Sequence, residues 1–165
     1  MLIHLSDEIA VLVSIAAWIV IGVATGLAGH LMPLRWLDHD NWLTRPRRFE
    51  ARGRIYQRVF RIRAWKDRVP ELGGLFRGGF SKRHLIDRST PQLERFEAET
   101  RRAELVHWAN LDAGPLFLIW CPPWIGAVMI VFGVVAHLPF IMIQRYNRAR
   151  LARLLDRRAR RSLQP

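Results

Sequence analysis

Three polar residues have the chemistry of a general base. Glu104 and His107 lie three residues apart in a stretch with helical period, so their side chains can touch. A carboxylate that holds an imidazole orients it for proton transfer. The alternative is structural: a Glu104–His107 pair at a membrane interface, or Glu104 bonded to one of the many arginines. His84 is a second candidate base, although a lone histidine in a loop is usually only solvated.

The helix predicted to carry Glu104 and His107 has a mixed face. At 100° per residue, about one third of the circumference collects six side chains: Leu93, Phe96, Thr100, Ala103, Glu104 and His107. A face with leucine, phenylalanine and alanine should pack inward, and a buried carboxylate needs a partner. Thr90-Pro91 predicts the start of this helix, with threonine as the cap and proline at the first helical position.

Basic residues beside glycines give a candidate anion site. Arg77, Lys82 and Arg83 flank Gly78-Gly79, whose backbone N–H groups could help to hold a phosphorylated substrate. Contact with lipid headgroups explains the same residues equally well. The sequence has no GxSxG motif, P-loop, dinucleotide fingerprint or cluster with metal-ligand spacing, so we expect neither a metal nor a bound cofactor. Cys121 is the single cysteine, which excludes an intramolecular disulfide.

The distribution of charge defines the elements that must position these residues. The 165 residues include 26 Lys and Arg and give a net charge of +12. Of the basic residues, 18 lie in residues 35–102 and 8 in residues 145–161, while residues 1–34 and 109–144 contain none. Nucleic acid and anionic lipid headgroups both attract a basic chain. Only membrane association also explains the two apolar stretches, so we expect membrane lipids and no nucleic acid as partners.

We therefore predict an all-α membrane protein with a single membrane domain over residues 1–165. Residues 9–32 are long enough for a transmembrane helix, because a bilayer core needs about 20 helical residues. Residues 105–143 predict a membrane hairpin with a short or re-entrant arm, a turn at Cys121-Pro122-Pro123 and one full span, because both of its flanks are basic. Asp112 fits this hairpin where the arm bends or faces protein.

The positive-inside rule sets the orientation. The basic region 34–104 and the basic tail 144–165 should lie on the cytoplasmic side of the cell membrane in a multi-pass topology. Residues 54–63 predict a basic amphipathic helix on the membrane surface, with Ile55, Tyr56, Val59, Phe60 and Ile62 on one face and Arg54, Gln57, Arg58 and Arg61 on the other. Residues 144–148 predict an interfacial anchor after the last span.

Four motifs follow one another along the chain: Arg63-x-Trp65-Lys66, Arg83-His84-Leu85, Glu99-Thr100-x-Arg102-Ala103-Glu104-Leu105-x-His107-Trp108 and Gln144-Arg145-Tyr146-Asn147-Arg148-x-Arg150-Leu151. As a set they resemble the glycosyl-4,4'-diaponeurosporenoate acyltransferase family, small bacterial membrane proteins of staphyloxanthin-type carotenoid synthesis. The resemblance covers roughly residues 54–155. Its specificity comes from the two longest blocks at their observed separation.

The resemblance implies a membrane-bound O-acyltransferase. A fatty acyl group would move from an acyl thioester, such as acyl-CoA, to a sugar hydroxyl of a glycosylated lipid or carotenoid. Such a reaction needs a base for the hydroxyl proton and donors for the oxyanion. The implied catalytic candidates are His84, Glu104 and His107. The substrate-binding candidates are Trp65, Lys66, Arg77, Lys82, Arg83, Glu99, Arg102, Arg145, Tyr146, Asn147 and Arg148.

Two positions depart from the family pattern. His137 stands where the family tends to have asparagine, and Asp112 is also unusual. Either change is compatible with a different lipid-like glycoside acceptor. Assembly with other enzymes of the pathway is a further expectation. The rival hypothesis is a non-catalytic membrane accessory or anchor protein that binds anionic lipid through its basic regions.

Overall fold

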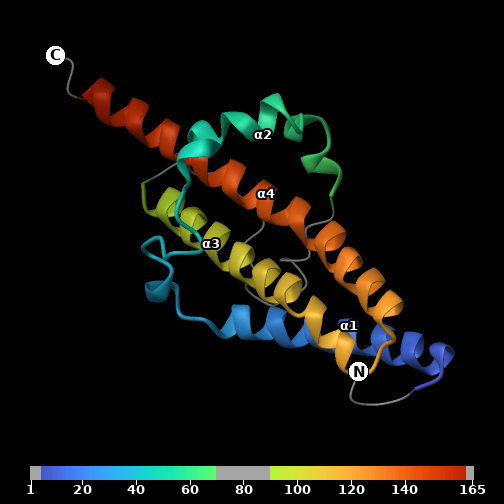
Figure 1. Ribbon diagram of the computed structural model, residues 1–165. Helices are drawn as coiled ribbons and strands as arrows, with labels where there is room; N and C mark the ends of the chain where they lie inside the picture. The colour runs from blue at the N-terminus through green and yellow to red at the C-terminus, as the bar shows by residue number, and fades with distance from the viewer. Residues whose placement is uncertain (1–4, 70–89, 163–165) are drawn as a thin grey trace. The chain divides into compact units, whose positions relative to one another are not determined.

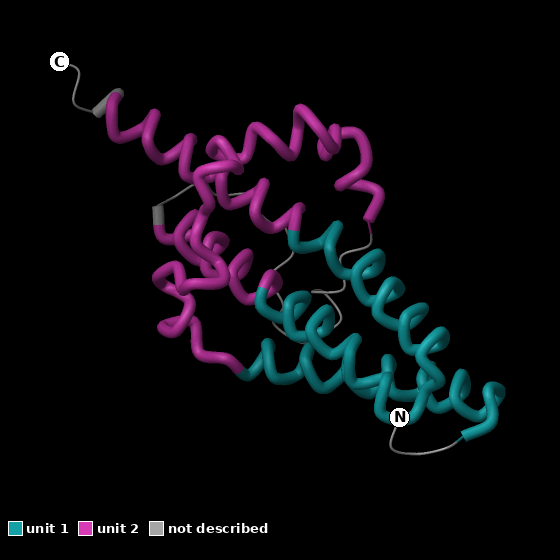
Figure 2. The backbone as a smooth tube through the Cα atoms, in the orientation of Figure 1, with its two compact units in different colours: residues 1–31, 105–141 teal, residues 32–104, 142–165 magenta. Residues whose placement is uncertain are grey.

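The computed structural model describes residues 5–69 and 90–162, with the backbone alone described at residues 90, 161 and 162. The described elements are all helical, as the sequence predicted (Figure 1). They fall into two compact units (Figure 2). Unit 1 comprises Met1–Leu31 and Leu105–Ile141, and unit 2 comprises Met32–Glu104 and Met142–Pro165.

Unit 1 begins with α1 (Asp7–Leu31), which confirms the predicted N-terminal helix within two residues at each end. The acidic residues Asp7 and Glu8 lie in its first turn, where they complement the positive end of the helix dipole. Trp18 organises the core of the unit. Its ring stacks on Phe117 with 4.7 Å between centroids and meets Phe132 edge-on at 5.4 Å.

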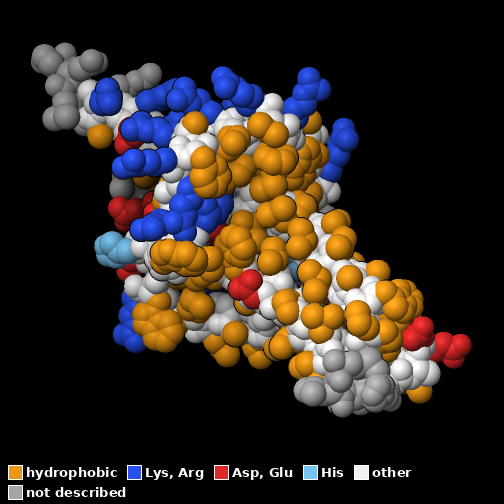
Figure 3. Space-filling view, in the orientation of Figure 1, with side chains coloured by type: hydrophobic (Ala, Val, Ile, Leu, Met, Phe, Trp, Pro, Cys, Tyr) orange, Lys and Arg blue, Asp and Glu red, His pale blue; other side chains and the backbone are white. Residues whose placement is uncertain are grey.

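The surface of unit 1 is unusually apolar. Helices α1 and α4 (Pro123–Ser162) are both long and apolar enough to cross a membrane. Leu12, Val20, Leu31 and Val135 are each about two-thirds exposed rather than packed in a protein core. On the face seen in Figure 3, hydrophobic side chains cover this unit. Many apolar residues of these helices therefore point outward, as expected of surfaces that face lipid.

In the region predicted to form a hairpin, the α-helices are interrupted between Asp112 and Pro123. Helix α3 (Thr90–Asp112) ends at Asp112, the 3₁₀ segment η7 (Gly114–Ile119) follows, and α4 starts at Pro123. Asp112 thus lies where the chain bends. The predicted boundaries at residues 104 and 143 are not helix ends, because α3 begins at Thr90 and α4 continues to Ser162. The change in the density of basic residues along α3 and α4 therefore does not end either helix.

Unit 2 contains a chain of short helices between α1 and α3. They are η1 (Leu34–Trp36), η2 (Arg48–Gly53), α2 (Arg54–Arg58), η3 (Ile62–Ala64) and η4 (Lys66–Arg68). The predicted single helix over residues 54–63 is wrong in its second half. Helix α2 ends at Arg58, and Arg61 has φ 47°, which is outside the right-handed helical region. This break allows Ile62 to be fully buried, whereas Val59 and Phe60 stay exposed.

Candidate functional site

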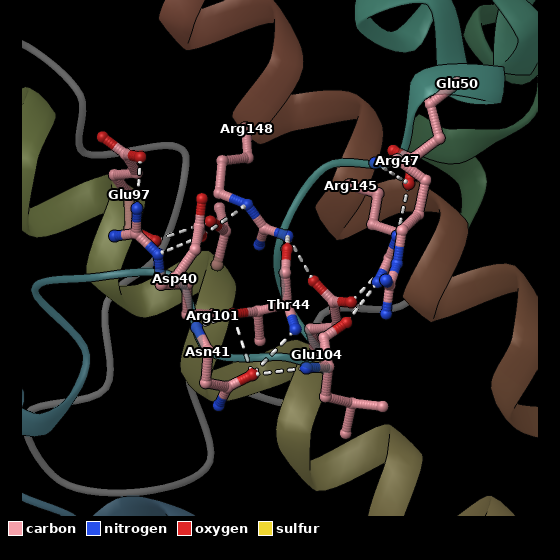
Figure 4. A network of polar contacts seen from close by, with 12 residues as sticks. Asp40, Asn41, Thr44, Arg47, Glu50, Glu97, Arg101, Glu104, Arg145 and Arg148 are labelled. Atoms are coloured by element: carbon pink, nitrogen blue, oxygen red, sulfur yellow. Dashed lines mark hydrogen bonds and ion pairs between the residues drawn. The ribbon is translucent and has the colours of Figure 1, made fainter.

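A buried carboxylate, Glu104, lies at the centre of unit 2. It is fully buried on α3, and its two oxygens accept hydrogen bonds from different arginines of α4. Arg145 Nε lies 2.6 Å from Oε1, and Arg148 Nη2 lies 2.6 Å from Oε2. An ionised carboxylate in a protein interior needs such partners, because the cost of removing it from water is otherwise large. Figure 4 shows this arrangement.

Arg145 joins three parts of the chain. Its Nε atom bonds Glu104, its Nη1 atom donates to Glu50 Oε1, and its Nη2 atom donates to the carbonyl oxygen of Leu43. Glu50 is itself only 3% exposed. Five N–H groups in a fixed plane allow one arginine to bind several acceptors at once, which lysine cannot do.

The segment that supplies these acceptors is shaped by local hydrogen bonds. Asn41 Oδ1 accepts from the backbone N–H groups of Leu43 and Thr44, both at 2.8 Å. This side-chain turn holds Leu43 and Thr44 so that their carbonyl oxygens accept from Arg145 and Arg148. Glu50 Oε1 also accepts the backbone N–H of Arg47 at 3.0 Å, which anchors the start of η2.

An apolar cluster lies beside the ionic one. Tyr56, Ile62, Met142, Ile143 and Tyr146 are buried together, with Trp65 packed against them. Burial, and secondarily the negative charge of Glu50, raise the pKa of Tyr56 above its usual value. The phenol therefore stays protonated.

Further ion pairs extend the network along α3. Arg101 Nε donates to Asp40 at 2.7 Å, and its Nη2 donates to Glu97 at 2.6 Å. Arg102 Nη1 lies 3.0 Å from both oxygens of Glu99. Arg148 Nε lies 3.8 Å from Asp40 Oδ1, so Asp40 contributes to both groups of charges.

The structure brings several of the predicted site residues together. Glu104, Arg145 and Arg148 form one cluster, which agrees with the alternative in which Glu104 is bonded to arginine. Glu99 and Arg102 pair with each other. Trp65 and Lys66 have local partners, and Trp65 also packs against the apolar cluster. Tyr146 lies in the apolar cluster, and its hydroxyl oxygen accepts a hydrogen bond from Arg63. Asn147 is buried, and within residues 5–69 and 90–162 its Nδ2 atom has no hydrogen-bond partner.

Four predicted residues lie outside the described residues: Arg77, Lys82, Arg83 and His84.

His107 is placed in unit 1 with a second histidine. Its Nδ1 atom lies 3.1 Å from Nδ1 of His137, and its ring stacks on Phe140 with 4.5 Å between centroids. Trp18 lies 5.9 Å from the His137 ring, centroid to centroid. Two imidazoles in an apolar environment can hydrogen-bond each other when one ring carries its proton on Nδ1 and the other does not.

Sequence reasoning missed Asp40, Glu50 and Thr44 as parts of the ionic cluster, and His137 as a partner of His107. One signal was available for Glu50. It is the single carboxylate in residues 41–66, a stretch rich in arginine, and such a residue has many candidate cationic partners. Nothing in the spacing connects Asp40 or Thr44 to α4, because both contact Arg148, which is more than 100 residues away in the sequence.

Comparison with known proteins identifies the family. The family model described as glycosyl-4,4'-diaponeurosporenoate acyltransferase matches residues 38–157. The chain belongs to this family. Proteins named glycosyl-4,4'-diaponeurosporenoate acyltransferase from Staphylococcus aureus strains bovine RF122 / ET3-1, USA300 and NCTC 8325 / PS 47 are each 28% identical to it over 138 residues. The aligned region covers 84% of this chain and 83% of each relative. No solved structure matches the chain.

The region that matches the glycosyl-4,4'-diaponeurosporenoate acyltransferase family includes both candidate groups of site residues. The matched region contains the whole ionic cluster from Asp40 to Arg148 and also the pair of His107 and His137. The chain is therefore an acyltransferase by family. Among the described residues, no group of three or more His, Cys, Asp or Glu side chains could hold a metal ion.

Proposed function

We propose that this chain is a membrane-bound O-acyltransferase that acylates a sugar hydroxyl of a glycosylated carotenoid or a related glycolipid. The observation that carries the proposal is the family match over residues 38–157, with relatives named for transfer to glycosyl-4,4'-diaponeurosporenoate. An apolar acceptor of this kind resides in a bilayer. The outward-facing apolar residues of α1 and α4 support the same location.

The proposed reaction begins with attack of the sugar hydroxyl on the carbonyl carbon of an acyl thioester. A C–O bond forms and the C–S bond breaks, and the proton of the hydroxyl passes through a base to the leaving thiolate. A positioned base typically contributes about 10²–10⁴-fold to such a rate. Groups that donate hydrogen bonds to the developing oxyanion supply further stabilisation.

His107 is our candidate for that base among the described residues. If the proton in the contact with His137 is carried by Nδ1 of His107, the Nε2 atom of His107 is left unprotonated and can accept the hydroxyl proton. His137 then acts as a positioning residue that fixes the tautomer. Asparagine can accept the same hydrogen bond through its side-chain oxygen, which fits the family's usual residue at this position.

Glu104 has a different role in this proposal. Both of its oxygens are already bonded to guanidinium groups of Arg145 and Arg148, so the carboxylate has little capacity to accept a proton from substrate. We assign it to holding α3 and α4 within unit 2. Glu104 thereby supports the site rather than reacting.

Lipid profiling by mass spectrometry tests the function. The gene is expressed in a host that makes the glycosylated carotenoid, and the acceptor is expected to gain the mass of one acyl group. His107→Ala should abolish most of this gain. His137→Asn should keep it, whereas His137→Leu should lower it about tenfold or more. Loss of the product in His84→Ala alone would transfer the role of base to His84, and an unmodified acceptor with the wild-type chain would refute the function.

Topology is tested separately with reporter fusions. Fusions at residues 79 and 165 are expected to report the cytoplasmic side, because the basic residues cluster around both positions. A fusion near residue 123 should report the opposite side or be shielded by the membrane. Opposite results for residues 79 and 165 would reject the hairpin.

A further inference from the structure

Unit 2 contains a cleft of about 730 Å³ whose walls are mostly arginine. The volume is within the range of small-molecule binding sites, which is about 300–1,000 Å³. Six arginines line it together with Gly53, Gln57 and Tyr146: Arg52, Arg54, Arg58, Arg63, Arg153 and Arg157. The cleft is separate from the ionic cluster around Glu104, since the two share no residue.

The arginines come from two helices and the segments next to them. Arg54 and Arg58 are four residues apart and share a face of α2. Tyr146, Arg153 and Arg157 lie within about 40° of one another around α4, at 100° per residue. One wall of the cleft is therefore a continuous stripe of α4.

The geometry between these walls is fixed by Gly53. This residue has φ 80°, and a Cβ atom added to it would lie 2.6 Å from Cβ of Ala149 on α4. The backbone at Gly53, just before α2, is therefore in close contact with α4. Ala51 and Arg52, the two residues before it, also have positive φ. The turn brings the backbone of Arg52 to α4, where its carbonyl oxygen accepts a hydrogen bond from Arg153.

The positive charge of the cleft is largely uncompensated. Within the described residues, only Arg52 of the six has an ion-pair partner, Asp156 at 3.6 Å. Arg63 is held in place by donating from Nε to the hydroxyl oxygen of Tyr146 at 2.8 Å. The hydroxyl hydrogen of Tyr146 is then free to donate to a ligand. Guanidinium groups that outnumber carboxylates in one cleft attract an anion, and arginine binds phosphate oxygens in pairs.

We propose that this cleft binds the phosphate groups of the acyl donor, a thioester whose leaving group carries two or more phosphates on a nucleotide. The inference rests on the proposed acyl transfer and adds the donor site to it. Several arginines in one cleft match a ligand with several phosphates better than a carboxylate or a single phosphate. Anionic lipid headgroups have the same chemistry, so the test separates the two sources.

The experiment measures binding of adenosine 3',5'-bisphosphate to the full chain in detergent by isothermal titration calorimetry. Adenosine, which lacks the phosphates, is the matched ligand control. The double variant Arg58→Gln/Arg157→Gln removes one arginine from each wall, and neither has a hydrogen-bond or ion-pair partner within the described residues that the fold would lose. Arg48→Gln/Arg160→Gln removes the same charge at exposed positions outside the cleft.

We expect the bisphosphate to bind and adenosine not to bind. The cleft variant should weaken binding about ten- to hundredfold, since charge-assisted contacts are lost, and the control variant should leave it within about twofold. Equal weakening in both variants would reject a defined site. Failure of the bisphosphate to bind, with cleft-dependent binding to vesicles containing phosphatidylglycerol, would assign the cleft to lipid headgroups and overturn the donor site. If the acceptor is still acylated in cells in that case, the proposed function stands without this cleft.

Discussion

The interiors of units 1 and 2 differ in the polarity of their buried side chains. Unit 1 has aromatic rings and apolar side chains inside, and its polar contacts involve neutral groups such as Ser14, Cys121, Asn110 and Thr25. Unit 2 encloses charged groups, with Glu50, Glu104, Arg145 and Arg148 all less than 10% exposed. On the face seen in Figure 3, Lys and Arg side chains gather over unit 2.

The difference shows how a chain with a net charge of +12 can combine an apolar surface on unit 1 with buried, paired arginines in unit 2. Neutral hydrogen bonds fit the proposed location of unit 1 in a bilayer, because an unpaired charge in hydrocarbon is costly. Where arginines are numerous, the structure uses carboxylates of α3 and η2 to neutralise those that enter the core. The scarce acidic residues of unit 2 are therefore its most consequential ones.

The largest expected effect comes from breaking the ionic core of unit 2. Glu104→Ala leaves Arg145 without one partner and Arg148 with only its longer contact to Asp40 as an ion pair, which should lower the free energy of unfolding by about 3–5 kcal/mol. Glu99→Ala on the same helix removes only the pair with Arg102 and should cost about 1 kcal/mol. Thermal unfolding in detergent, followed by circular dichroism, measures both. Equal losses would show that the depth of burial does not matter.

A second substitution separates charge from geometry. Arg145→Lys keeps the positive charge but cannot reach Glu104, Glu50 and the Leu43 carbonyl at once. We expect a loss of about 2–3 kcal/mol in the free energy of unfolding. Arg150→Lys, at an exposed position of the same helix, should be neutral. A neutral Arg145→Lys would indicate that charge alone holds the cluster.

A third substitution tests the contact of η2 with α4. Gly53→Ala should cost about 1–2 kcal/mol for the left-handed conformation, and more because of the clash with Ala149. Ala149→Gly removes that clash. In a double-mutant cycle the two changes should therefore couple favourably by about 0.5 kcal/mol or more. Strict additivity would contradict the close approach.

The smallest effect is expected in unit 1. Ser14 accepts a hydrogen bond from Trp120 Nε1 at 3.2 Å, and its Oγ lies 3.2 Å from Cys121 Sγ. Ser14→Ala should lower stability by only about 0.6 kcal/mol, the average for hydrogen bonds between membrane helices. A loss as large as that of Glu104→Ala would remove the contrast between the two units.

The sequence predicted the helices better than it predicted their partners. Period and capping located α1 and the start of α3, and the non-helical residues Cys121 and Pro122 lie directly before α4. The mixed face of α3 correctly indicated that Leu93, Thr100 and Glu104 are buried. The break after α2 was missed because it depends on a positive φ at Arg61, a residue that rarely adopts this conformation.

The partner of Glu104 could not be chosen from spacing. His107 is three residues away, whereas Arg145 is 41 residues away, and local spacing gives no information about the second distance. The same limit applies to His107, whose contact with His137 joins two helices. Helical spacing predicts which face of a helix a residue lies on, but tertiary packing determines which of the many arginines pairs with Glu104.

The ion pairs of Arg145 also constrain the order in which the protein can mature. Glu50 and Glu104 are synthesised 95 and 41 residues before Arg145, and the whole apolar stretch 105–144 emerges in between. Until Arg145 and Arg148 leave the ribosome, neither carboxylate has these partners and unit 2 cannot bury them. Unit 2 can therefore be completed only after the final apolar stretch has been synthesised. A chain truncated before residue 145 should accordingly be recognised as incomplete and degraded, which pulse–chase labelling would detect.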